Sequence, residues 1–129
     1  MKKSVAAAVV FLDGRILITR RAPGQNLEGL WEFPGGKVEP GETLQECITR
    51  ELNEELGVTS VAGEILMTVS YDYPGGTIDL TAILVELQST QFTVQVHDLY
   101  EWVRPDDLLL YDLAPADISI AEELVRKYG

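Results

Sequence analysis

The stretch that decides the fold runs from Gly36 to Val58 and reads GKVEPGETLQECITRELNEELGV. It begins as a loop rich in glycine and proline and continues as a helix predicted over residues 43–56. Thr43, with Glu46 three residues later, forms a capping-box pattern, which starts a helix. Gly57 suits the left-handed position that ends one. The sequence therefore predicts a loop followed directly by a capped helix.

Three glutamates share one side of this predicted helix. At 100° per residue, Glu51, Glu54 and Glu55 fall within an arc of about 100°, beside the apolar arc expected to face the core. Carboxylates at these spacings repel one another, and a partly buried face needs protons or cations to neutralise them. Mg²⁺, or Mn²⁺ in its place, takes such oxygen ligands. A charged surface helix explains these residues about equally well.

Arg50 is predicted to support one of these glutamates. It lies one turn after Glu46 and one turn before Glu54. Residues four apart on a helix are neighbours, so a charged ladder along this face would hold Glu54 in place.

The glycines ahead of the helix make the metal interpretation stronger. Glycine lets the backbone approach a ligand, and its carbonyl or amide can meet metal or phosphate, although a simple turn also explains Gly35-Gly36. The spacing is more specific: Gly36, five residues, Glu42, seven residues, then RELNEELGV over residues 50–58. This is a complete Nudix box, and the chain resembles Nudix hydrolases over nearly its whole length.

The flanking sequence agrees with the fold that this resemblance implies. That fold is an α/β/α sandwich with a mixed β-sheet, formed by residues 1–129 as a single domain, with a C-terminal helix over about 116–128. The residue pattern itself predicts a mixed sheet between helices. Strand-like runs, paired around Asp13-Gly14 and Pro74-Gly75-Gly76 turns, cover Val5–Leu12, Arg15–Thr19, Val58–Tyr73, Thr77–Leu87 and Tyr100–Val103. Trp31-Glu32-Phe33 is a short extended piece stopped by Pro34-Gly35-Gly36, and residues 37–42 form a loop.

The resemblance also implies roles in catalysis. Glu51, Glu54 and Glu55 are expected to bind the metal together with the carbonyl of Gly35. Either Glu51 or Glu54 is instead expected to orient or deprotonate the attacking water, and the sequence does not choose between them. Arg50 is grouped with these catalytic residues.

Substrate binding is expected on both sides of this box. Within the family, the chain is most similar to the MutT-type nucleoside triphosphate pyrophosphohydrolases, and its Leu113–Ile118 segment to the CTP pyrophosphohydrolase branch. The residues expected to bind substrate are Arg21, Glu32, Phe33, Pro34, Gly35, Lys37, Tyr73 and Asp117. An arginine fork suits phosphate, although Arg20 and Arg21 also read as a surface pair at a strand end.

The base end of the substrate is the less specific part of the resemblance. Asp117 is expected to face the base, but a carboxylate in the first turn of a helix is also a capping residue. Phe33 and Tyr73 are the candidates for stacking on the base. Trp31 and Trp102 are expected in the core, and Cys47 as a small buried hydrophobe.

The chain departs from the family at two positions. An arginine near the base in the oxidised-guanine enzyme corresponds to Gly76 here, so base specificity is expected to differ. Many relatives carry a glutamate in the loop before Trp102, where it assists metal or water. That position is Val96 here, so the helper is absent or is replaced by His97 or Asp98. A plain surface role for His97 is the simpler interpretation.

Composition restricts the partners and the location. The formal net charge of −11 argues against binding a nucleic-acid polymer, which requires many Lys and Arg contacts. The apolar run Val5–Leu12 is too short to cross a membrane. A lone cysteine, Cys47, fits a reducing compartment. We expect a cytoplasmic protein, a monomer or weak homodimer, whose partner is a small nucleotide.

Three functions remain in competition. The first is a Mg²⁺-dependent nucleoside triphosphate pyrophosphohydrolase that releases a monophosphate and pyrophosphate and removes modified nucleotides of cytidine or 8-oxo-dGTP type. The second is a Nudix hydrolase of ADP-ribose, a nucleotide sugar or a dinucleotide. The third is a catalytically silent nucleotide sensor, which the intact set of box glutamates disfavours.

Overall fold

The computed structural model describes residues 2–24, 27–93 and 97–129. Its elements, in chain order, are β1 (Lys2–Leu12), β2 (Arg15–Arg21), β3 (Trp31–Glu32), β4 (Gly35–Lys37), α1 (Leu44–Leu56), β5 (Ser60–Tyr73), β6 (Gly76–Leu87), β7 (His97–Val103), the 3₁₀ helix η1 (Pro105–Leu110) and α2 (Pro115–Tyr128). In these ranges the strands form one mixed sheet in the order β3-β2-β1-β6-β5, with β4 on β1 and β7 on β2.

Strand β1 lies at the centre of the sheet and is buried on both faces. It runs parallel to β6 and antiparallel to β2 and β4. Successive side chains of a strand point to opposite faces. Ala6, Ala8 and Val10 therefore pack in the cluster that contains α1, whereas Ala7 and Val9 pack in the cluster that contains α2.

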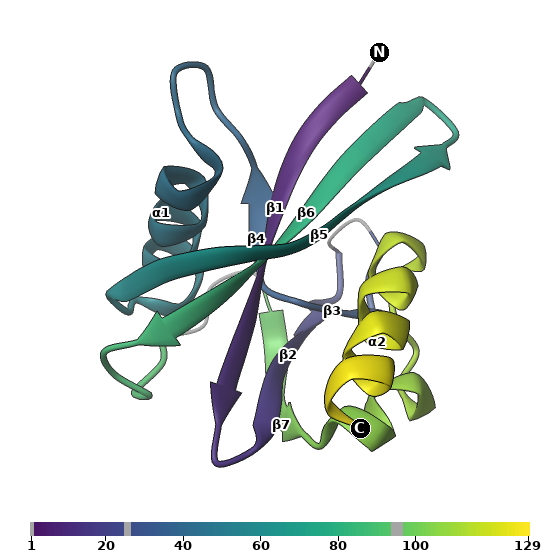
Figure 1. Cartoon of the computed structure of the whole chain (residues 1–129). Coiled ribbons are helices and arrows are strands. Elements are labelled where there is room, and N and C mark those ends of the chain that lie inside the picture. Colours follow the sequence, from purple (N-terminus) through teal and green to yellow (C-terminus); the bar gives the residue numbers. More distant parts are fainter. Residues whose placement is uncertain (1, 25–26, 94–96) are drawn as a thin grey trace.

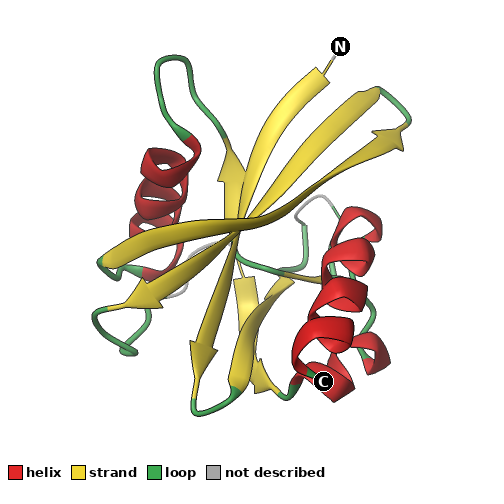
Figure 2. Ribbon diagram, viewed as in Figure 1, coloured by secondary structure: helices red, strands yellow, loops and turns green. Residues whose placement is uncertain are grey.

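The two helices lie on opposite sides of the strands (Figures 1 and 2). Helix α1 packs through Ile48, Leu52 and Leu56, while α2 packs through Ile120 and Leu124 together with η1. The predicted α/β/α sandwich with a mixed sheet is thus confirmed. No helix in the described ranges is long and apolar enough to cross a membrane.

Helix α1 begins and ends as predicted. Thr43 is its N-cap, and the capping box with Glu46 is complete, with both reciprocal hydrogen bonds at 2.9 and 3.1 Å. Gly57 ends it in the left-handed region at φ 69°. The predicted C-terminal helix is also confirmed and begins at Pro115.

The prediction for residues 34–37 was wrong. Gly35–Lys37 is not a turn and loop but strand β4, paired antiparallel to Val5–Ala7 of β1. A Cβ atom on Gly35 would overlap the carbonyl oxygen of Ala6. The glycines thus serve strand pairing at close range, which a Gly-Gly pair read alone does not reveal. The structure also adds the 3₁₀ helix η1 (Pro105–Leu110), for which the sequence analysis made no prediction.

The capping box gives a prediction about stability. Thr43→Ala removes the acceptor for the Glu46 amide, so we expect the free energy of unfolding in urea to fall by about 1 kcal/mol. Thr43→Ser keeps the hydroxyl and should retain most of the stability. Equal midpoints for Thr43→Ala and the unmodified protein would contradict the capping assignment.

Candidate active site

Helix α1 places its three glutamates at different depths. Its leucines and isoleucine fix the buried face, so the carboxylates at the edge of that face become partly buried in turn. Residue Glu55 is 7% exposed, while the side chains of Glu51 and Glu54 are 16% and 55% exposed. The predicted position of these carboxylates, beside the buried face, is confirmed.

Glu55 is the most confined of the three. Its Oε2 atom is buried and has no hydrogen-bond partner. Burial, followed by the charges of Glu32 and Glu51, raises the pKa of Glu55 to about 9, against the opposing effect of Arg21 and of a hydrogen bond from the backbone of Gly35. A carboxylate in this environment keeps a proton at neutral pH unless a cation replaces it.

Glu51 lies directly against the backbone of Gly36. A Cβ atom at Gly36 would collide with the Glu51 carboxylate, so this strand position requires glycine. Burial raises the pKa of Glu51, and hydrogen bonding and the charge of Arg50 oppose that rise. The glycines of β4 and the glutamates of α1 are therefore parts of one site.

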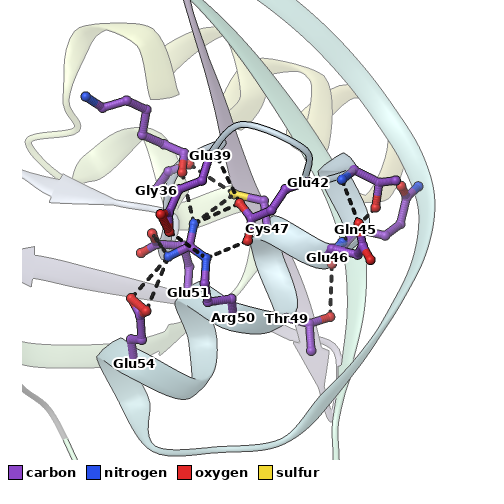
Figure 3. Close-up of polar contacts among 12 residues, drawn as sticks. Gly36, Glu39, Glu42, Gln45, Glu46, Cys47, Thr49, Arg50, Glu51 and Glu54 are labelled. Atoms are coloured by element: carbon purple, nitrogen blue, oxygen red, sulfur yellow. Dashed lines mark hydrogen bonds and ion pairs between the residues drawn. The ribbon is translucent and has the colours of Figure 1, made fainter.

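Arg50 is the centre of the charged network on α1 (Figure 3). Its Nε and Nη2 atoms bind both oxygens of Glu42 at 2.6 and 3.0 Å, and Nε also lies 3.2 Å from Glu39. Its Nη1 atom donates to Glu51 at 2.8 Å and to Glu54 at 3.1 Å. The hydrogen bond from Arg50 lowers the pKa of Glu42 to about 2.

The predicted ladder is therefore half correct. The contact between Arg50 and Glu54 is confirmed, but Glu46 turns to the capping box instead of to Arg50. The anchors that sequence reasoning missed are Glu39 and Glu42, which lie in the loop before the helix. Helical spacing could not identify them, because their contact with Arg50 depends on how the loop folds back.

The donor set fits a hard divalent cation. Carboxylate oxygens and backbone carbonyls are the ligands that Mg²⁺ and Mn²⁺ prefer, and Oε2 of Glu55 is a buried oxygen without a partner. In the described ranges, no three Asp, Glu, His or Cys side chains are gathered closely enough to hold a metal ion. Glu51 and Glu54 instead point to Arg50.

A cavity of about 600 Å³ adjoins strand β4. That volume is in the range of small-molecule sites. Seven residues predicted to bind substrate line it: Arg21, Glu32, Phe33, Gly35, Lys37, Tyr73 and Asp117. Pro34 is not among the lining residues; its carbonyl oxygen accepts a hydrogen bond from the Ala8 amide at 2.7 Å.

The structure separates the two arginines at the end of β2. Arg21 lines the cavity, and its Nε atom lies 3.4 Å from Oε2 of Glu32. Arg20 lies over the ring of Trp31, 5.9 Å from its centroid. Of the two, Arg21 is the one positioned to meet a ligand in the cavity.

Asp117 closes the other side of the cavity and does not cap α2. The N-cap position is Ala114, and Oδ1 of Asp117 accepts a hydrogen bond from the Phe33 amide at 3.2 Å. Burial, followed by the charge of Glu32, raises the pKa of Asp117 to about 8, although the Phe33 amide and Arg21 lower it. At neutral pH the carboxyl group therefore carries a proton in the ligand-free protein.

The aromatic residues divide between core and cavity. Phe33 is 3% exposed, so its ring offers little surface for stacking, whereas Tyr73 is half-buried and its hydroxyl accepts from the Ala116 amide at 3.2 Å. Trp31 and Trp102 are half-buried and pack against the two core clusters, and Cys47 is fully buried.

The β5–β6 turn forms one wall of the cavity, and it includes Gly76, which the resemblance relates to an arginine near the base in the oxidised-guanine enzyme. Pro74, Gly75, Gly76 and Thr77 all line the cavity. Proline and glycine identify a turn but give no sign of what the turn faces. A second cavity, of about 660 Å³, is lined mainly by apolar residues such as Phe11, Val61 and Leu84 and contains none of the predicted site residues.

The position at which many relatives carry the helper glutamate is occupied by Val96. Val96 is outside the described residues. Of His97 and Asp98 the backbone is described, as the start of β7, with His97 paired to Arg21.

Comparison with known proteins agrees with this arrangement. The NUDIX domain family matches residues 2–124. The chain is 39% identical to the CTP pyrophosphohydrolase of Escherichia coli K12 over 118 residues, covering 92% of this chain and 87% of that protein. It is 38% identical to the 8-oxo-dGTP diphosphatase of Haemophilus influenzae, covering 95% and 91%.

Solved structures match this chain over nearly its whole length. The solution structure of the E. coli ORF135 protein superposes with a TM-score of 0.84 at 35% identity, covering 97% of this chain and 89% of that one. A MutT protein from Methanosarcina mazei superposes with a TM-score of 0.83 at 27% identity, covering 98% and 94%. The chain therefore belongs to the NUDIX domain family, the Nudix hydrolases.

Proposed function

We propose that this chain is a Mg²⁺-dependent nucleoside triphosphate pyrophosphohydrolase that releases a nucleoside monophosphate and pyrophosphate. The observation that supports this most directly is the position of β4 (Gly35–Lys37). Gly36 lies against the Glu51 carboxylate, and Gly35 and Gly36 both line a cavity of nucleotide size that also contains Arg21 and Asp117. The proposed metal ligand Glu51, the proposed phosphate contact Arg21 and the proposed base contact Asp117 would thus be grouped around one strand.

The residues would divide the work along the substrate. Arg21 would bind phosphate oxygens, with Glu32 holding the guanidinium in place. Glu51, Glu54, Glu55 and the Gly35 carbonyl would hold Mg²⁺, which when bound neutralises charge on the phosphate oxygens and lowers the pKa of water. One of Glu51 and Glu54 would receive the proton of the attacking water. Tyr73 and Asp117 would contact the base.

Nucleotides of cytidine type are the proposed substrates, with 8-oxo-dGTP as the second candidate. The 39% identical relative is named a CTP pyrophosphohydrolase, and several others are named 8-oxo-dGTP diphosphatases. We also propose a cytoplasmic location, where free nucleotides occur. The alternative substrates, ADP-ribose and nucleotide sugars, receive no support from a particular residue of the cavity.

The metal assignment predicts the effect of removing one charge. Glu54→Gln should lower kcat on the order of 100-fold, as loss of a single transition-state contact does in other enzymes. It should leave the melting temperature nearly unchanged, because Glu54 is exposed, its ion pair with Arg50 is worth little at the surface, and its loss also relieves repulsion from the neighbouring glutamates. The measurement is pyrophosphate release from CTP with Mg²⁺. Full activity in EDTA, or in Glu54→Gln/Glu55→Gln, would refute the assignment.

The phosphate assignment predicts different results for the two neighbouring arginines. Arg21→Ala should lower kcat/KM about 10- to 100-fold, the size of a lost charged hydrogen bond. Arg21→Lys should recover part of this, because lysine lacks the planar fork. Arg20→Ala is the matched control and should keep kcat/KM near the original value. Equal losses for Arg20→Ala and Arg21→Ala would remove the distinction.

The base assignment predicts a change in substrate preference. Asp117→Asn keeps the size of the side chain and the acceptor for the Phe33 amide but cannot ionise. We expect the ratios of kcat/KM among CTP, 5-methyl-dCTP and 8-oxo-dGTP to change in this variant. In the unmodified protein the ratios should also change as pH passes about 8, where Asp117 ionises.

A stability measurement checks the same ionisation. Between the ordinary pKa of 3.8 and about 8, the folded protein retains a proton on Asp117 that the unfolded chain has released. Stability should therefore fall across this window as pH rises, relative to Asp117→Asn.

A uniform loss of activity on all three substrates, with pH-independent ratios, would show that Asp117 has no contact with the base.

A further inference from the structure

The guanidinium of Arg50 is divided between two sets of carboxylates. Its Nε–Nη2 edge binds Glu42 through both oxygens, and the carbonyl of Lys37 accepts from Nη2 at 3.1 Å. This edge is held by the loop before the helix. Its remaining nitrogen, Nη1, contacts Glu51 and Glu54, two of the proposed metal ligands (Figure 3).

The two sets differ in their ability to move. The contact with Glu42 is bidentate and charge-assisted, which is the strongest arrangement available to arginine. The Nη1 atom makes one contact with Glu51, at 2.8 Å, and two longer contacts with Glu54, at 3.1 and 3.3 Å, whose side chain is exposed. An ion that binds Glu51 and Glu54 competes with Nη1 and not with the bidentate contact to Glu42, so it would break the Nη1 contacts and leave the Glu42 edge in place.

We propose that Arg50 is a resident counter-ion at the metal site, which a divalent cation must displace from Glu51 and Glu54 while Glu42 and Glu39 retain it. In the metal-free protein the guanidinium neutralises carboxylates that would otherwise repel one another. When the metal binds, the same positive charge opposes it, and Glu42 limits that opposition by holding the guanidinium back. Arg50 and Glu42 would then set metal affinity in opposite directions. The inference rests on the metal site of the proposed function.

The alternative is that Arg50 only orients the glutamates for the metal. The two ideas predict opposite signs for the same variant. If Arg50 orients the ligands, Arg50→Gln should weaken metal binding. If Arg50 competes with the metal, Arg50→Gln should tighten it.

The experiment is titration of the substrate-free protein with MnCl₂, followed by electron paramagnetic resonance of free Mn²⁺ and by calorimetry. We expect Arg50→Gln to lower the Kd on the order of tenfold, as expected for one charge removed near a divalent ion at a partly exposed site. Arg50→Lys should also bind Mn²⁺ more tightly than the unmodified protein, because a lysine ammonium group cannot contact Glu42, Glu51 and Glu54 at the same time. Arg126→Gln, a remote change on α2, is the matched control.

A second variant tests the anchor without removing Arg50. Glu42→Gln should raise the Kd, because the guanidinium is released toward Glu51 and Glu54. Glu46→Gln also removes one negative charge near the start of α1, but the Glu46 side chain belongs to the capping box and does not contact Arg50. This variant therefore measures the general effect of losing a negative charge. The inference requires a larger increase for Glu42→Gln than for Glu46→Gln. Melting temperatures in EDTA identify any variant that fails to fold.

Magnetic resonance of the arginine side chain provides a direct check. On addition of Mg²⁺ the Nη1 signal of Arg50 should shift, while the Nε signal should stay near its original position. Unchanged or weaker Mn²⁺ binding in both Arg50→Gln and Arg50→Lys, or an unshifted Nη1 signal at saturation, would overturn the inference alone. If Glu54→Gln/Glu55→Gln binds Mn²⁺ as well as the unmodified protein, the proposed metal site itself fails, and the inference with it.

Discussion

The close approach of β4 to β1 is the constraint on which the site depends. A side chain at Gly35 would overlap the Ala6 carbonyl, and one at Gly36 would overlap the Glu51 carboxylate. Without side chains, the short strand pairs with β1 and also packs against α1. Because Gly35 and Gly36 have no side chains, the Glu51 carboxylate and the cavity both lie next to β4. Any side chain there would separate the Glu51 carboxylate from the cavity.

The second constraint is electrostatic. Burying Glu55 and Asp117 raises the pKa of each, because water no longer stabilises the ionised form. Glu32 contributes to both shifts, and Arg21 opposes both. The surroundings of these two groups therefore disfavour a further negative charge unless a cation accompanies it. A triphosphate can enter such a site when a divalent cation accompanies it, since the metal reverses the sign of the local charge.

Helix α2 is tied to the cavity by contacts from distant parts of the chain. Asp117 accepts from the Phe33 amide, Ala116 donates to the Tyr73 hydroxyl, and the backbone of Trp31 pairs with that of residues Asp112 and Ala114. Together these contacts fix the start of the helix against β3 and the end of β5. These contacts connect the Asp117 side of the cavity to the segment just before β4, across the 84 residues that separate Phe33 and Asp117 in the sequence.

The sequence by itself determined the local features of this protein. The limits of α1, its capping box, its left-handed Gly57 and the arc of its glutamates follow from helical periodicity and backbone preferences, which act over a few residues. The spacing of the box identified the family, and with it the sandwich and seven of the residues that line the cavity. The tertiary structure alone decided the partners of these residues: Glu42 and Glu39 for Arg50, the Phe33 amide for Asp117, and strand pairing for Gly35. These contacts join segments whose separation no local pattern encodes, because they depend on which surfaces become buried together when the sheet and both helices pack.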